Sequence, residues 1–219
     1  MAIYNTKQSF KNFVTGDSNE FAFKCASYVA EDRENICNPL LLWGKSGTGK
    51  THLMMAIEDH IREDDPAIKI KYMTTKQLMA DIVNHCRENS LNEMKKTYSS
   101  LDVLLIDDIQ DLAGKEATQD MVLDLLEDLY AGKKQIVMTA DREPDRIQGL
   151  NRKIVSRIKR GVVAKINAPD YWVKKRIMRQ YMADLELELS DSLEDSILKE
   201  SHNVFEIEGE VKKQFMRFF

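Results

Sequence analysis

The chain has 219 residues, of which 43% are hydrophobic and 31% charged, and its formal net charge is −4. This composition predicts a globular protein of one large or two small domains and excludes a globally basic nucleic-acid binder, so any DNA contact must use a local surface. The sequence has no signal peptide and no run of about 18 apolar residues, and its three scattered cysteines favour a reducing, cytoplasmic location.

Apolar periodicity predicts strands that alternate with helices along the first two thirds of the chain. After an irregular stretch at residues 1–19, we expect a helix at 19–31 and a short buried strand at 39–43. The elements expected next are a helix to about residue 62, a strand at 68–73, helices at 75–84 and 91–98, a strand at 103–107, a helix at 118–130, and strands at 135–140 and 162–166. This alternation predicts an α/β fold, a doubly wound parallel sheet with helices on both faces.

From residue 171 onward the sequence shows only helical periodicity, at 171–185, 190–201 and 205–219. We therefore predict an α/β nucleotide-binding subdomain at 1–168 and a small helical lid at 169–219. The apolar tail at 215–219 is expected to be aggregation-prone unless it packs on the lid or on a partner.

A glycine-rich loop separates the first strand from the next helix and fits the pattern G-x-x-x-x-G-K-[ST] at every fixed position. Its residues are Gly44, Lys45, Ser46, Gly47, Thr48, Gly49, Lys50 and Thr51, and His52 follows directly. The glycines let successive backbone N–H groups face an anion, and the helix N-terminus adds free donors and a positive dipole. We expect Lys50 to reach the β- and γ-phosphates of a nucleotide and the Thr51 hydroxyl to ligate Mg²⁺.

Two consecutive acids stand at the end of the buried strand that begins at Val103, on the side of the sheet where the loop also lies. Asp107 is placed to hold Mg²⁺ directly or through water, and Asp108 to polarise an attacking water. At the end of the next strand, Thr139 or Asp141 can sense a γ-phosphate, although an ordinary strand-to-loop turn is an equal alternative.

A basic segment at 151–160 leaves two interpretations open. It is either a solvated helix face, as most runs of charge are, or it delivers an arginine finger to the nucleotide of a neighbouring subunit.

With these residues placed, the chain resembles the ATPase domain of the bacterial DnaA family of replication initiators, which belongs to the AAA+ class. The likeness extends over nearly the whole length. Its most specific strings are residues 49–53, 106–110, 112–116 and 169–171. The resemblance implies ATP or ADP and Mg²⁺ as cofactors, Asp107 and Asp108 as the Walker B acids, and Asp141 in the sensor 1 segment. It makes Arg157 the interprotomer arginine finger and Lys153 a second basic residue beside it.

The resemblance also implies a surface for single-stranded DNA. Residues 75–98 match the helical insertion that marks replication initiators, and Val83 and Lys115 match positions that touch the strand. Two departures weaken the pattern: Phe205 replaces the sensor 2 arginine, and Ala117 replaces a basic residue near the DNA channel. Each lost phosphate contact is expected to reduce the salt dependence of binding by about one unit of slope.

These expectations give an ATP-binding initiator module that assembles with itself, engages origin or single-stranded DNA and hydrolyses ATP slowly. Two alternatives are a regulatory adaptor that acts on a full-length initiator, and a helicase loader whose partner is the replicative helicase. The match ends before the family's helix-turn-helix domain, so we expect either an excised domain or a short paralogue.

Overall fold

The computed structural model describes residues 7–31 and 36–217 of the chain. At the centre of these residues is a sheet of five parallel strands in the order β2-β3-β4-β1-β5. The strands are β1 (Leu40–Trp43), β2 (Ile70–Thr74), β3 (Val103–Asp107), β4 (Gln135–Ala140) and β5 (Val162–Lys165). The predicted parallel α/β sheet is therefore confirmed.

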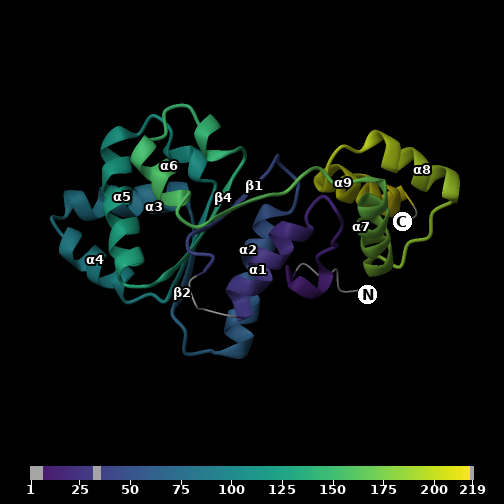
Figure 1. Ribbon diagram of the computed structural model, residues 1–219. Coiled ribbons are helices and arrows are strands. Elements are labelled where there is room, and N and C mark those ends of the chain that lie inside the picture. Colours follow the sequence, from purple (N-terminus) through teal and green to yellow (C-terminus); the bar gives the residue numbers. More distant parts are fainter. Residues whose placement is uncertain (1–6, 32–35, 218–219) are drawn as a thin grey trace.

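Helices cover both faces of the sheet, as Figure 1 shows. One face packs against α1 (Glu20–Glu31) and α2 (Lys50–Asp64). The other face packs against α3 (Thr75–Arg87), α4 (Leu91–Ser99), α5 (Glu116–Ala131) and α6 (Arg152–Ile158). Side chains alternate along each strand, so Leu104 belongs to one core and Leu105 to the other. Burial on both faces explains why the inner strands β1 and β3 are nearly continuous apolar runs, whereas β2, at the side of the sheet, contains Lys71 and is only partly buried.

The last three helices are α7 (Tyr171–Asp184), α8 (Asp191–Glu200) and α9 (Val204–Arg217). They gather at one end of the molecule in Figure 1 and share an apolar cluster of their own around Met178, Leu198 and Val211. Phe215 packs against this cluster, so this part of the tail is covered, whereas residues 218–219 lie outside the described ranges. The boundary at residue 169 stays a prediction.

Element boundaries differ from the sequence prediction by a few residues. Strand β2 begins at Ile70 rather than at Ile68, because the Ile68 N–H closes a turn by donating to the Asp65 carbonyl at 3.2 Å. Helix α3 continues to Arg87, three residues beyond the predicted end. The stretch predicted to be irregular contains a short 3₁₀ helix, η1 (Phe10–Asn12), beside α2. Within the described ranges, no helix is both long and apolar enough to cross a membrane.

Candidate nucleotide-binding site

The glycine-rich loop joins β1 to α2 at the carboxyl edge of the sheet, as the sequence predicts. Gly47 and Gly49 have φ values of 71° and 99°, which L side chains rarely adopt, so both positions require glycine. The Lys50 Nζ donates to the carbonyl oxygens of Gly44 at 2.9 Å and Lys45 at 3.0 Å. Burial lowers the pKa of Lys50, and nearby carboxylates oppose this shift. The ammonium group is thus held inside the loop.

The buried Asp107 carboxylate at the end of β3 accepts hydrogen bonds from three hydroxyl groups. Its Oδ2 accepts from Thr51 Oγ1 at 2.9 Å and from the Tyr72 hydroxyl at 3.1 Å, and its Oδ1 accepts from Thr139 Oγ1. The structure therefore brings together Thr51 and Asp107, the two residues predicted to hold Mg²⁺. The contact between Tyr72 and Asp107 was not predicted from the sequence, because the alternation of side chains along the strand indicates only that Tyr72 is half-buried.

Asp108 adopts a left-handed backbone conformation, with φ 62° and ψ 56°. Its N–H donates to Thr139 Oγ1 at 2.9 Å, and its Oδ1 accepts from Gln110 Nε2 at 2.9 Å. Gln110 Oε1 in turn accepts from the Asp141 N–H at 3.1 Å. Such conformations persist where the surroundings fix them, and they gather at functional sites. Gln110 links the second acid to the end of β4, a role the sequence did not suggest.

The two candidate γ-phosphate sensors lie in different environments. Thr139 is fully buried and contacts both Asp107 and Asp108. The Asp141 carboxylate instead forms two hydrogen bonds with the Arg142 guanidinium, at 2.8 and 2.6 Å, and these hold its pKa below the ordinary value. Asp141 nevertheless remains close enough to Lys50 for their charges to interact.

The His52 ring contacts the segment before α1. Its Nε2 lies 2.9 Å from the Ser9 carbonyl oxygen and 3.0 Å from Asn12 Oδ1, and Phe13 packs edge-on against the ring. Because both oxygens are acceptors in this geometry, Nε2 carries the proton in the neutral ring. Burial lowers the pKa of His52. The sequence motif placed His52 with the nucleotide-binding residues; its side chain packs against the N-terminal segment and also lines the cavity beside the loop, so a nucleotide contact stays a prediction.

The lid contacts the phosphate loop directly, which the sequence could not show. The Val204 N–H, at the start of α9, donates to the Gly47 carbonyl at 3.2 Å. A Cβ added to Gly47 would lie 2.9 Å from the Asn203 Cβ, so the two segments are in close contact. Phe205 follows directly along α9 and is 64% exposed.

A cavity of about 520 Å³ lies between the loop, the N-terminal segment and the lid. Thr48 and Gly49 belong to the loop side of its lining, Phe13 to the N-terminal segment, and Val173 and Tyr181 to α7. The loop thus forms one wall of a pocket whose other walls are mixed apolar and polar, as in small-molecule sites generally.

Arg157 lies far from the loop of its own chain. Its Nε donates to Glu127 Oε1 on α5 at 2.7 Å, and its Nη2 forms an ion pair with the same oxygen at 2.6 Å. Arg157 also lines a cavity with Pro39, which precedes β1, whereas the loop follows the other end of that strand. A four-residue strand is about 13 Å long, so at least this distance separates the amino ends of the strands, where Pro39 lies, from the carboxyl ends, where the loop lies. The buried residues Ile154 and Ile158 anchor α6; Arg152 and Lys153 are exposed, and Arg157 is half-buried.

The two predicted DNA contacts are exposed, on neighbouring elements. Val83 lies on α3 and is 37% exposed. Lys115 directly precedes α5 and follows the short helix η2 (Ile109–Leu112), which packs against α3. An ion pair of 3.4 Å between Lys76 and Asp111 also joins α3 to η2. Ala117 is exposed in the first turn of α5.

The oxygen atoms of Thr51 and Asp107 suit Mg²⁺, which usually binds one or two carboxylates together with substrate phosphates. Among the described residues, no group of three or more His, Cys, Asp or Glu side chains could hold a metal by itself. The donor set therefore fits an ion that nucleotide phosphates help to coordinate.

Comparison with known proteins gives a consistent result. The family described as Bacterial DnaA ATPase domain matches residues 4–165. The chromosomal replication initiator protein DnaA of Methylacidiphilum infernorum (isolate V4) is 38% identical over 210 residues, which are 95% of this chain and 46% of that protein. The chain spans about half the length of the curated relatives it matches.

Solved structures extend the likeness to the lid. Domain III of the Thermotoga maritima replication initiation protein DnaA has a TM-score of 0.91 and 32% identity, covering 98% of this chain and 90% of that one. A replication initiator DnaA bound to AMPPCP and single-stranded DNA has a TM-score of 0.90 and 31% identity, covering 99% of this chain and 67% of that one. These matches confirm the predicted AAA+ fold class.

Proposed function

This chain belongs to the bacterial DnaA family of ATPase domains, and we propose that it is an ATP-switched assembly module of a replication initiator. The observation that carries the proposal is the contact between Thr51 and Asp107, because it joins the phosphate loop to the Walker B strand beside the cavity. The relative bound to AMPPCP and single-stranded DNA supports the same ligands for this chain.

We assign the phosphates of ATP or ADP to the glycine-rich loop and the base and sugar to the cavity between the loop and α7. Thr51 and Asp107 would hold Mg²⁺, which supplies charge neutralisation on the phosphates when bound. Asp108, fixed by Gln110, would orient the attacking water. Hydrolysis is expected to be slow, because Asp108 is the one water-activating group we assign.

Assembly follows from the position of Arg157. Its guanidinium lies at the sheet edge opposite the loop of its own chain, so it is available to the nucleotide of a neighbouring copy. The product of assembly would be an oligomer or filament in the cytoplasm. Val83 and Lys115 would then contact single-stranded or origin DNA, and the lost basic group at Ala117 would reduce the affinity.

The exposed Phe205 favours a second candidate function. A phenyl ring cannot donate a hydrogen bond to a γ-phosphate, so discrimination between ATP and ADP is expected to be weaker than in a chain with arginine there. A regulatory adaptor that keeps nucleotide bound and offers Arg157 to a full-length initiator would tolerate this loss.

The decisive experiment is fluorescence anisotropy of a labelled single strand, titrated with protein in ATP, in ADP and without nucleotide, at two salt concentrations. We expect cooperative binding in ATP alone, weakened by salt. Lys50→Ala should abolish nucleotide binding and the ATP response, whereas Lys199→Ala, which changes an exposed lysine on α8 outside the loop, should retain both.

Three outcomes would count against the proposal. Unchanged ATP affinity in Lys50→Ala would refute the assignment of the loop. Equal DNA binding in ATP and ADP would refute the switch. Nucleotide binding without DNA binding in any state would favour the adaptor, and capture of the replicative helicase in that case would favour a loader.

A further inference from the structure

The Asp107 carboxylate contacts one hydroxyl group that lies outside the phosphate loop, the Walker B pair and the sensor strand. Thr51 and Thr139 belong to the predicted loop and sensor strand, but the third donor is Tyr72, in the middle of β2. Its hydroxyl donates to Asp107 Oδ2, the same oxygen that accepts from Thr51. Asp107 is only 4% exposed, so water has little access to replace a lost donor.

Strand register explains how Tyr72 reaches this oxygen. Strands β2 and β3 are parallel neighbours, in which Tyr72 pairs with Leu105 and Thr74 pairs with Asp107. Tyr72 and Asp107 are therefore diagonal neighbours on one face of the sheet, and the aromatic side chain is long enough to bring its hydroxyl to 3.1 Å from the carboxylate. This face packs against α2, which contributes Thr51.

We propose that Tyr72 is a positioning residue for the carboxylate that holds Mg²⁺. Its hydroxyl fixes the orientation of Asp107 so that one oxygen atom faces Thr51 and the metal position. Tyr72 touches neither metal nor nucleotide; it acts through Asp107, as hydrogen-bonded neighbours of metal-binding carboxylates generally do. This inference rests on the proposed function, because it requires a Mg²⁺–nucleotide site at the loop.

The test is the Mg²⁺ requirement for nucleotide binding by the whole chain carrying Tyr72→Phe, which removes one oxygen atom and keeps the ring. A fluorescent ATP analogue is titrated at a series of Mg²⁺ concentrations and in EDTA. Loss of such a neighbour typically reduces metal affinity by 10–100-fold, so we expect the half-maximal Mg²⁺ concentration to rise at least about tenfold. Affinity in EDTA should stay at the unmodified value, since the loop itself is unchanged.

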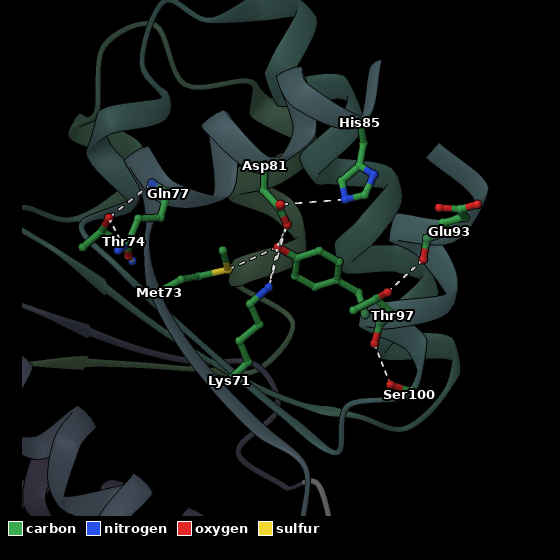
Figure 2. Close-up of polar contacts among 10 residues, drawn as sticks. Lys71, Met73, Thr74, Gln77, Asp81, His85, Glu93, Thr97 and Ser100 are labelled. Carbon is green, nitrogen blue, oxygen red and sulfur yellow. Dashed lines mark hydrogen bonds and ion pairs between the residues drawn. The ribbon is translucent and has the colours of Figure 1, made fainter. Parts of the chain in front are cut away.

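Tyr98→Phe is the matched control, because it removes an equivalent hydrogen bond in the insertion helices. Tyr98 is fully buried, and its hydroxyl donates to Asp81 Oδ2 at 2.7 Å. Figure 2 shows Lys71 of β2 and Asp81 and His85 of α3 converging on this cluster. We expect Tyr98→Phe to lower the melting temperature and to leave the Mg²⁺ requirement unchanged.

Three outcomes would overturn the inference alone. The first is a Mg²⁺ requirement of Tyr72→Phe within twofold of the unmodified chain. The second is an equal shift in Tyr98→Phe, which would assign the effect to general loss of rigidity. The third is a fall in affinity of Tyr72→Phe in EDTA, because the defect would then lie in the loop. If the unmodified chain bound no nucleotide under any condition, the proposed function itself would be refuted.

Discussion

Replacement of Arg157 by alanine should impair assembly and leave folding nearly unchanged, because the contact that Arg157 makes within its own chain is weak. The Arg157 and Glu127 side chains are 33% and 44% exposed. An ion pair with this exposure contributes about 0.2–1 kcal/mol to the free energy of unfolding. For a chain of this size, Arg157→Ala should therefore lower the melting temperature by no more than about 4 °C.

The expected effect on assembly is much larger. In an assembled pair, Arg157 would contact the γ-phosphate of the neighbouring copy in a site shielded from water. Removing one partner of such a charge pair typically costs 2–5 kcal/mol. At about 1.4 kcal/mol per factor of ten, the dissociation constant for ATP-dependent assembly should rise at least about thirtyfold. Nucleotide affinity of the single chain should not change, because the loop lies at the opposite edge of the sheet.

Sedimentation velocity in ATP and in ADP measures assembly, and a fluorescent nucleotide measures binding. Arg160→Ala is the control: it removes an arginine from the same surface, whose guanidinium lies 5.6 Å from the centre of the Tyr130 ring. A mixture of the Arg157→Ala and Lys50→Ala variants should form pairs. In such a pair the Arg157→Ala chain supplies an intact loop with bound nucleotide, and the Lys50→Ala chain supplies the arginine. Normal ATP-dependent assembly of Arg157→Ala, or an equal loss in Arg160→Ala, would refute the finger assignment.

Two further predictions concern stability. Burial lowers the pKa of His52, so the unfolded chain takes up a proton near pH 6.5 that the folded chain does not bind. The free energy of unfolding should therefore decrease as the pH falls from 7 to 5. Urea denaturation at both pH values should show a smaller decrease in free energy for His52→Gln, and an equal decrease in that variant would contradict the prediction. A Cβ added to Gly161 would lie 2.6 Å from the Pro39 nitrogen and overlap the Pro39 backbone, so Gly161→Ala should destabilise the fold by about 1–3 kcal/mol. Gly209 lies in an open helical position, so Gly209→Ala should stabilise the fold by up to about 1 kcal/mol. Thermal melting of both variants tests this contrast, and a loss of stability in both would contradict it.

Much of the fold could be predicted because its signals are local. Strand β4 was predicted over residues 135–140, where every residue is buried, and the structure gives the same bounds. The run ending in Asp107 likewise predicted a covered parallel strand with an acid at its end. The error at Ile68 arose because a residue in a turn continued the alternation of the strand that follows it.

The candidate site was predicted where a motif fixes both residue type and spacing, as for Lys50. Contacts between distant segments carry no such signal. Tyr72 looks like any half-buried strand residue until the register with β3 places it diagonally from Asp107. His52 follows the motif directly, yet its ring direction depends on the segment at 9–12, about forty residues earlier. Sequence patterns identify the atoms of a site better than they identify what holds those atoms in place.

The hydrogen bond between Gly47 and Val204 has a consequence for how the protein matures during synthesis. The two residues are 204 − 47 = 157 positions apart, and the bond joins the phosphate loop to the start of α9. At about 5–20 residues per second, a ribosome needs roughly 8–30 seconds to make the intervening chain. During that interval the sheet and the loop helix can form, but the loop lacks its contact with α9. The nucleotide pocket is therefore completed only after α9 has been made, well after the strands that carry the loop and the Walker B acids.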